Sequence, residues 1–271
     1  MAPMPATIHI TFATAQFSQS RRVLRRSARR YGVNLRIYGP EHPIVRLAHD
    51  ENPKIMSRKD RGAGYWLWKP YIILDTLTSV PEGTLVLYTD VAVTYIADPS
   101  KLFEFAASRD ITLFDNLAEY KQEDWTKRDC FVLLDADAEP HWNRTQLDAA
   151  FQIYRAGASA IEFVQACKRA MRDSRILIDE PNVCGGPDPP GLMEDHRHDQ
   201  SVLTIFAVRY GLPSFRSPSR QPAATESAPS YPQVFFHHRR RDVRFDKHVR
   251  DWLKGRYHRP RQDPTRAMPT D

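Results

Sequence analysis

One acidic residue of this chain directly follows a run of residues typical of a buried strand. Residues 84–89 (TLVLYT) are nearly all apolar or β-branched, which predicts a central strand that ends at Asp90. Ligands of open α/β sheets bind at the carboxyl ends of strands. A carboxylate there can hold a divalent cation through oxygen and so neutralise a diphosphate leaving group. The alternative is that Asp90 only caps a turn or the next helix.

A second polar group stands where a coil passes into a helix. Residues 194–200 (EDHRHDQ) combine carboxylates and imidazoles within a few positions. Asp199 can act as a general base towards a hydroxyl, approach a metal, or contact a bound sugar, and Gln200 follows it. Asp199 can equally be the acidic residue that a helix dipole favours at a helix N-terminus. The repeated His and Asp spacing of a hydrolase metal site is not found.

Two histidines late in the chain are candidate metal ligands. His237 and His238 follow a strand-like apolar piece and precede a basic run that begins at Arg239. Neutral imidazoles bind metals, and arginines clamp phosphate oxygens. A solvated basic face is the plainer interpretation, and nucleic-acid binding is a further alternative that no recognisable motif supports.

Other candidates for chemistry rest on shorter patterns. Asp135 and Asp137 form an Asp-x-Asp pair after an apolar run at 131–134, and we weigh this pair as a competing metal site, although residues 139–142 after it resemble an exposed loop. Trp66 can stack on a base or sugar, as can Trp68, and Lys69 can meet phosphate. Core packing is the default interpretation for aromatic residues beside a helix.

The elements that must position these residues alternate between strand and helix. Periodicity and turn residues predict strands at 7–14, 33–38, 84–89, 111–114 and 131–134, and helices at 18–31, 70–79, 146–156, 160–172 and 198–210. The opening strand, helix and strand indicate a parallel α/β sheet. We expect a rigid coil at 185–191 and a flexible loop at 215–231.

Composition limits the class of protein and of partner. The chain has 271 residues, a formal net charge of +6 and a pI near 9.3, so its partners are expected to be anionic: nucleic acid, an anionic membrane surface or a diphosphate-bearing substrate. Three cysteines without a CxxC pattern predict reduced thiols in a cytoplasmic protein. No apolar run is long enough for a membrane span, so we expect a soluble or peripheral protein.

Several segments together resemble a family of bacterial and viral GT-A-type glycosyltransferases associated with capsule and lipopolysaccharide synthesis. The matching segments are residues 61–70 (RGAGYWLWKP), 87–90 (LYTD), 125–129 (WTKRD), 175–182 (RILIDEPN), 196–201 (HRHDQS) and 237–239 (HHR). They extend over nearly the whole chain. The resemblance implies one Rossmann-like GT-A domain at 1–241, a basic and partly disordered extension at 242–271, a nucleoside-diphosphate-sugar donor, and Mn²⁺ or Mg²⁺.

The resemblance also implies roles for individual residues. Asp90 matches the acidic residue of the family's Asp-x-Asp-like position, Asp199 and Gln200 match an Asp-Gln pair near the sugar, and His237 or His238 matches a late histidine. Together with the residues weighed above, the candidate donor-binding residues are Asp90, Lys69, Trp66, Arg128, His198 and Arg239. Ala92 stands where the second acid of Asp-x-Asp is expected, so either a histidine completes the metal site or basic side chains replace the metal.

The resulting hypothesis is transfer of a sugar to a glycan or lipid-linked hydroxyl in surface polysaccharide synthesis, with peripheral contact to an anionic membrane and no specific nucleic acid. A sugar-phosphate nucleotidyltransferase is one rival, but the glycine-rich basic loop of that class is missing after the first strand. A basic nucleic-acid-binding protein is the other rival, which predicts steeply salt-dependent affinity for DNA or RNA.

Overall fold

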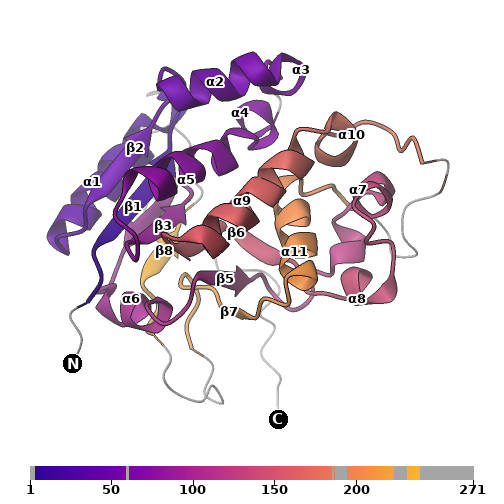
Figure 1. The fold of residues 1–271 in the computed structure, drawn as a ribbon. Helices are drawn as coiled ribbons and strands as arrows, with labels where there is room; N and C mark the ends of the chain where they lie inside the picture. The colour runs from indigo at the N-terminus through magenta and orange to yellow at the C-terminus, as the bar shows by residue number, and fades with distance from the viewer. Residues whose placement is uncertain (1–3, 59–60, 185, 187–193, 223–230, 239–271) are drawn as a thin grey trace, which may run out of the picture.

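A six-stranded sheet forms the centre of the molecule in the computed structural model, which describes residues 4–58, 61–184, 186, 194–222 and 231–238 (Figure 1). Its spatial order is β2-β1-β3-β6-β5-β7. The strands are β1 (Thr7–Phe12), β2 (Leu35–Tyr38), β3 (Leu85–Thr89), β5 (Ile111–Asp115), β6 (Leu147–Arg155) and β7 (Ser214–Arg216). A second sheet pairs β4 (Val93–Tyr95) with β8 (Phe235–His237).

Five of the six strands of the central sheet run in one direction. β1 is parallel to β2 and β3, β5 is parallel to β7, and β6 lies antiparallel between β3 and β5. The carboxyl ends of the parallel strands therefore share an edge with the amino end of β6. The expected fold class, an α/β protein with a mostly parallel sheet flanked by helices, is confirmed.

Three of the predicted segments are wrong. Residues 146–156, expected as a helix, contain β6, because this segment runs between two strands with both faces covered and so shows no alternation. Residues 131–134, expected as a strand, belong to the helix α7 (Arg128–Leu133), since a short apolar run fits either type. Residues 139–142, expected as a loop, form the short helix α8 (Glu139–Trp142).

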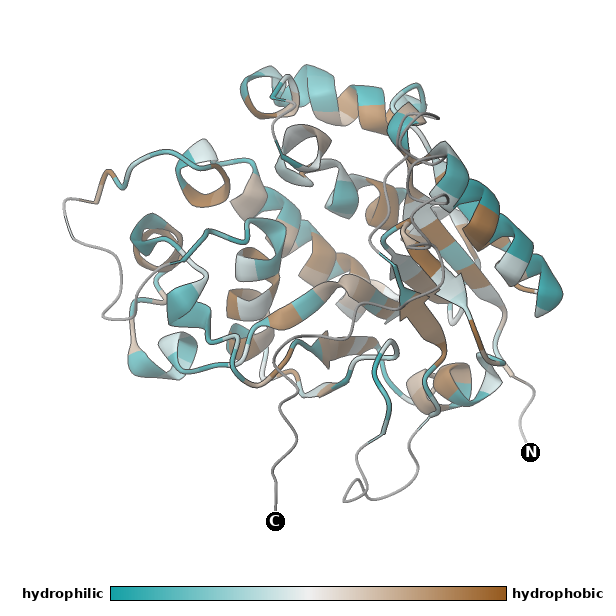
Figure 2. Cartoon of the chain, turned by 180° about the vertical axis from the view of Figure 1, so that it is seen from behind, coloured by the Kyte–Doolittle hydropathy of each residue, from teal (hydrophilic) through white to brown (hydrophobic). Residues whose placement is uncertain are grey.

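Helices cover both faces of the sheet, and the strands between them are apolar (Figure 2). The helices that contribute to the core of one face include α7 and, in addition, α2 (Pro43–Glu51), α3 (Pro53–Met56), α5 (Trp68–Ser79), α9 (Ala158–Met171), α10 (Ser174–Leu177) and α11 (Asp199–Arg209). On the other face α1 (Ser18–Arg30) and α6 (Ser100–Ala106) share a core with the β4–β8 sheet. The remaining short elements are η1 (Ala15–Phe17), α4 (Gly62–Tyr65) and η2 (Gln122–Asp124).

The other expected elements are present with shifted ends. Helices 18–31, 70–79, 160–172 and 198–210 correspond to α1, α5, α9 and α11. The expected flexible loop at 215–231 begins inside β7, and its residues 223–230 lie outside the described residues. Most of the coil at 185–191 and all of the extension at 242–271 lie outside them as well. No helix in the described ranges is long and apolar enough to cross a membrane.

Candidate functional site

Asp90 lies at the carboxyl end of β3, as the sequence predicts, and faces solvent. Its backbone N–H donates to the carbonyl of Ala150 on β6 at 3.1 Å, which fixes the residue to the sheet. Its carboxylate accepts a hydrogen bond of 2.8 Å from the Tyr88 hydroxyl, and its side chain is 35% exposed. Burial, together with the nearby Asp90, raises the pKa of Tyr88, so this phenol remains a hydrogen-bond donor.

A buried lysine joins Asp90 to the candidate catalytic acid. The Lys69 ammonium, near the start of α5, donates to the carboxylate of Asp199 and to the carbonyl of Ala149 at 3.1 Å. The same nitrogen lies 3.9 Å from the nearer oxygen of Asp90. The side chains of Lys69 and Asp199 are 5% and 9% exposed. Burial raises the pKa of Asp199, and the Lys69 ammonium acts against this rise.

The two carboxylates that share Lys69 differ in access. Asp199 is the first residue of α11, as the alternative helix-dipole interpretation also allowed, and a cavity of about 20 Å³ lies beside it and Lys69, room for about one water molecule. Asp90 has the more exposed carboxylate. A bound molecule therefore meets Asp90 first, with Asp199 and Lys69 behind it.

Asp148 is a third acidic residue at this edge, and the sequence interpretation missed it. Because β6 runs antiparallel to β3, its second residue lies beside the end of β3. The Asp148 carboxylate accepts from the Ser217 hydroxyl at 3.1 Å and from the Ala150 N–H at 3.2 Å. Burial raises the pKa of Asp148, with His237 lowering it and Asp90 raising it, so these charges act on one another.

The late histidines come to the same edge through the small sheet. His237 on β8 pairs with Val93 on β4, three residues after Asp90, and the His238 N–H donates to the Ala92 carbonyl at 3.0 Å. Carboxylate oxygens with an imidazole suit Mn²⁺, and carboxylates suit Mg²⁺. In the part of the chain that the structure describes, no three such side chains converge closely enough to form a ready metal cluster.

Asp135 and Asp137, the acid pair weighed as a competing metal site, do not follow a strand. Asp137 accepts hydrogen bonds from Arg128 at 2.6 Å and from the Trp142 indole N–H at 3.1 Å. Asp135 follows α7, so the strand that made this pair a candidate metal site does not exist. The contacts of Arg128 thus tie it to the α7–α8 region, and Arg239 lies outside the described residues.

The segment before Lys69 has an unusual backbone. Five successive residues adopt positive φ angles: Gly62, Ala63, Gly64, Tyr65 and Trp66. We call this segment the left-handed turn. Each non-glycine residue in this conformation costs about 1–2 kcal/mol. A Cβ on Gly64 would lie 2.8 Å from the Met56 Cα, so only glycine fits there. The Trp68 indole N–H donates to the Gly62 carbonyl at 2.8 Å and closes the turn.

The left-handed turn packs its aromatic rings on the residue before Asp199. The Trp66 ring stacks on the His198 imidazole with centroids 5.6 Å apart, and the Tyr65 ring meets it edge-on at 4.8 Å. His198 itself has a positive φ of 53°. These contacts fix the start of α11, so Trp66 supports Asp199 through His198.

Arg61 adds polar contacts at the start of α11. Its guanidinium donates to His198 Nε2 at 2.9 Å and forms ion pairs with Asp195 at 2.8 Å and Asp179 at 3.2 Å. The other ring nitrogen, Nδ1, lies 2.7 Å from the Leu177 carbonyl and must carry the proton, because a carbonyl only accepts. Burial lowers the pKa of His198, so the imidazole is neutral and serves to position its neighbours.

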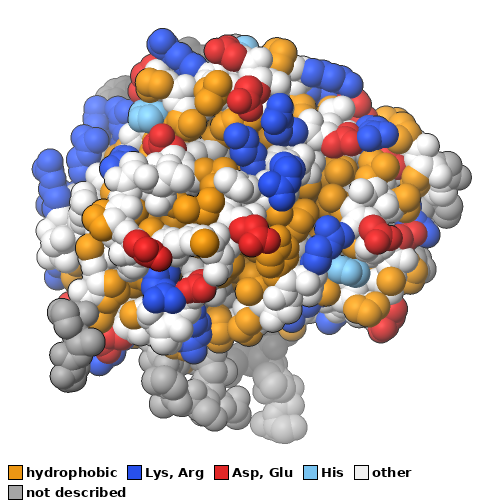
Figure 3. Space-filling model, viewed as in Figure 1, with side chains coloured by type: hydrophobic (Ala, Val, Ile, Leu, Met, Phe, Trp, Pro, Cys, Tyr) orange, Lys and Arg blue, Asp and Glu red, His pale blue; other side chains and the backbone are white. Residues whose placement is uncertain are grey.

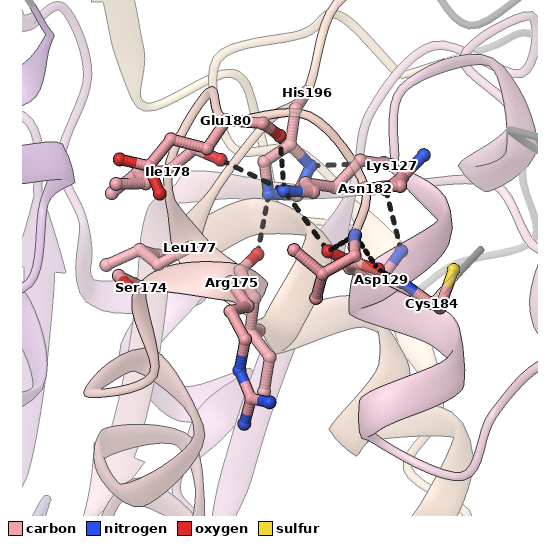
Figure 4. A network of polar contacts seen from close by, with 12 residues as sticks. Lys127, Asp129, Ser174, Arg175, Leu177, Ile178, Glu180, Asn182, Cys184 and His196 are labelled. Carbon is pink, nitrogen blue, oxygen red and sulfur yellow. Dashed lines mark hydrogen bonds and ion pairs between the residues drawn. The ribbon is translucent and has the colours of Figure 1, made fainter. Parts of the chain in front are cut away.

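A buried polar network lies beneath this segment (Figure 4). The Asp129 carboxylate accepts from the backbone N–H groups of Val183 at 2.8 Å and Cys184 at 2.9 Å. Burial acts to raise the pKa of Asp129, but these donors outweigh it and the pKa is lowered. The Lys127 ammonium donates to the Glu180 carbonyl at 2.7 Å. Residues 178–184 are therefore held against α7.

The histidine at position 196 joins this network to the 194–200 motif. His196 Nδ1 accepts from the Lys127 backbone N–H at 3.3 Å, and its Nε2 donates to the Ile176 carbonyl at 2.9 Å. Gln200 donates to the Gln146 side-chain oxygen at 2.5 Å. Segments 61–70, 125–129, 175–182 and 196–201, which carry the sequence resemblance, thus meet around Asp199. Sequence alone did not show that the neutral histidines at 196 and 198 position the motif.

No protein-family model and no curated protein matches the chain. Among solved structures it is similar to the bifunctional glycosyltransferase WbbM (TM-score 0.46, 11% identity, 82% of this chain and 40% of that one). It is also similar to the galactosyltransferase LgtC in complex with donor and acceptor sugar analogues (0.45, 12%, 85% and 86%) and to mouse xyloside xylosyltransferase 1 (0.43, 11%, 81% and 88%). The chain spans about two fifths of the length of WbbM. Each of these three proteins is named as a glycosyltransferase.

Proposed function

We propose that this chain is a glycosyltransferase that moves a sugar from a nucleoside-diphosphate sugar to a hydroxyl of a glycan or lipid-linked acceptor. The observation that carries the proposal is the pair of acids at the carboxyl edge of the sheet, Asp90 and Asp199, joined by the buried Lys69. Ligands of α/β proteins bind at this edge. Action in surface polysaccharide synthesis on the cytoplasmic side belongs to the same proposal.

The roles follow from exposure and charge. Asp90 is open to solvent and orients the diphosphate or ribose of the donor, directly or through a cation. Lys69 holds Asp199 in place, and Asp199 with Gln200 faces the transferred sugar or the acceptor. Trp66 and His198 form the wall that fixes the start of α11. Phosphate contacts from Arg128 and Arg239 stay predictions.

A divalent ion fits the chemistry of this edge. We propose that Asp90 and Asp148 would supply carboxylate oxygens and His237 an imidazole, with Asp148 in place of the acid that Ala92 lacks, although among the described residues these side chains do not converge into a formed cluster. Mn²⁺ or Mg²⁺ held there would supply positive charge that stabilises the diphosphate leaving group. His238 stays a second candidate ligand from the same segment.

Ligand binding provides the first test. A nucleoside diphosphate that binds the folded chain at 100 times its Kd raises the free energy of unfolding by about 2.7 kcal/mol. We expect one nucleotide to raise the Tm, and Mn²⁺ to increase this shift. A chain that no nucleoside diphosphate stabilises, with or without metal, contradicts the proposal.

Substitution of Asp90 provides the second test. Asp90→Asn should lower sugar transfer or donor hydrolysis by about 100-fold or more, because charge stabilisation at the leaving group is lost. Asp110→Asn is the matched control, since Asp110 pairs with Arg155 at the amino end of β5. A folded Asp90→Asn protein with full activity contradicts the assigned role.

A further inference from the structure

The first 40 residues are one of two strongly basic parts of this chain, the other being residues 239–271 with a net charge of +6. The first 40 residues contain seven arginines and neither Asp nor Glu, whereas the whole chain has a formal net charge of +6. Residues 41–238 between these two parts therefore have a net charge of −7. Six of the seven arginines lie on one helix, α1, which has 13 residues and no acidic residue.

Five of the six arginines of α1 lie on its outward half. The buried residues are Ser20, Leu24 and Ala28, and at 100° per residue all of the arginines except Arg21 point away from Leu24, the middle of the buried side. The six arginines are Arg21, Arg22, Arg25, Arg26, Arg29 and Arg30, and all are exposed. Figure 3 shows Lys and Arg side chains gathered along the edge of the molecule where α1 lies in Figure 1. We call this surface the arginine face.

The arginine face has no partner within the described protein. None of its six guanidinium groups forms an ion pair with any residue that the structure describes, and Arg30 alone lies near an aromatic ring, that of Tyr31 at 5.8 Å. Six like charges on one helix repel one another. Charges that the fold does not neutralise are available to an external anionic partner.

The inner side of α1 is fixed to the candidate site. Leu24 and Ala28 pack in the core that contains β4, and the Tyr95 backbone N–H donates to the Ser27 hydroxyl at 3.1 Å. Since β4 begins three residues after Asp90, a surface that binds the arginine face is held in a fixed relation to Asp90.

We infer that the arginine face is a docking surface for a bilayer that contains anionic phospholipids. Guanidinium groups bind phosphate oxygens in a bidentate manner, and the helix presents the arginines from Arg21 to Arg30 over about 14 Å. Val23, 43% exposed, is the only apolar side chain on the outward side of the helix, so docking is electrostatic and the helix does not insert. α1 itself contains no aromatic side chain on which the bases of single-stranded nucleic acid stack, and Tyr31 after its end is half-buried, which favours the lipid partner.

Vesicle binding by the full chain tests this inference, which does not depend on the proposed sugar transfer. The probes are vesicles of phosphatidylcholine alone and vesicles with 30% phosphatidylglycerol, and co-sedimentation is measured at low and at about 0.5 M salt. The variant replaces Arg22, Arg26 and Arg29 with Gln. The matched control replaces three exposed cations on other helices with Gln: Arg46, Lys54 and Lys101.

The expected results distinguish vesicle binding by the arginine face from vesicle binding by positive charge elsewhere on the protein. Each basic residue near an anionic surface contributes about fivefold to partitioning, so the α1 variant should bind phosphatidylglycerol vesicles roughly 100-fold more weakly than the wild type. The control variant should bind almost as well as the wild type, and added salt should release all of them. Unchanged thermal unfolding of the α1 variant would show that the helix is intact.

Three outcomes would overturn the inference. One is equal loss of binding in the two triple variants, and another is equal binding to vesicles of phosphatidylcholine alone. The third comes from competition: a DNA duplex that binds wild type more tightly than the anionic vesicles, and loses this advantage in the α1 variant, would assign the arginine face to nucleic acid.

Discussion

Replacing Lys69 with Met should destabilise the fold more than replacing its partner Asp199 with Asn. Lys69→Met leaves the Asp199 carboxylate, 9% exposed, without its cation. Asp199→Asn leaves the Lys69 ammonium with Asp90 at 3.9 Å and the Ala149 carbonyl at 3.1 Å. Because breaking a buried pair from one side costs about 3–5 kcal/mol, we expect that loss for Lys69→Met at neutral pH and a smaller loss for Asp199→Asn.

The loss should depend on pH in a defined direction. Burial already raises the pKa of Asp199, and removing the Lys69 ammonium removes the effect that opposes this rise. A carboxyl group whose pKa is higher in the folded state costs nothing below its unfolded pKa of about 3.9, and its cost grows as the pH rises towards the folded pKa. The stability deficit of Lys69→Met should therefore be small near pH 4 and complete at neutral pH.

Urea unfolding of wild type, both single variants and the double variant between pH 4 and 8 measures these differences. The double variant, Lys69→Met with Asp199→Asn, removes the isolated charge and should be more stable than Lys69→Met alone at pH 7. The reasoning is refuted if Lys69→Met loses less than about 1 kcal/mol at pH 7, or if the double variant is no more stable than Lys69→Met.

Two further predictions concern the backbone and the buried network. Ala63→Gly should raise the free energy of unfolding by about 0.5–1 kcal/mol, because glycine relieves the strain of a positive φ of 52°. The control Ala48→Gly, in the interior of α2, should instead lower the free energy of unfolding by at least about 1 kcal/mol. A lower Tm for Ala63→Gly than for the wild type would contradict this prediction. Asp129→Asn should cost about 1–3 kcal/mol at pH 7. Because the pKa of Asp129 is lowered in the fold, the contribution of its carboxylate to stability is present above the unfolded pKa and is lost on acidification. The free energy of unfolding of Asp129→Asn should therefore depend less on pH below about 4 than that of the wild type. The exposed control Asp50→Asn should show the same pH dependence of stability as the wild type.

The parallel part of the fold was predictable because its signals are local. The strand that ends at Asp90 is a continuous run of apolar or β-branched residues, and α1 shows Leu24 and Ala28 on one side with most of its arginines on the other. The resemblance also selected segments that the structure brings together around Asp199. Each of these signals is contained within about ten residues of sequence.

The antiparallel strand β6 was not predictable in the same way, and Asp148 was missed with it. Residues 147–155 (LDAAFQIYR) contain two alanines and no alternation, since the strand is covered on both faces. A helix fits such a segment equally well on local grounds, and only pairing with β3 and β5 decides between them. With β6 assigned, an acidic residue at its amino end would have pointed to the edge that holds Asp90.

The left-handed turn was also outside the reach of sequence patterns. Glycines at 62 and 64 indicate a turn, but Ala63, Tyr65 and Trp66 have no intrinsic preference for positive φ. Contacts made elsewhere impose this backbone, among them Met56 against Gly64 and His198 against Trp66.

The same turn affects the order in which the molecule assembles. Arg61 donates to the His196 carbonyl, 135 residues later in the chain, so the local contacts of the left-handed backbone are not complete until that distant segment has been synthesised and has docked. We therefore expect residues 62–66 to be among the last to become ordered. Their amides should exchange with solvent faster than those of β3, and any molecule that closes over Trp66 should slow that exchange.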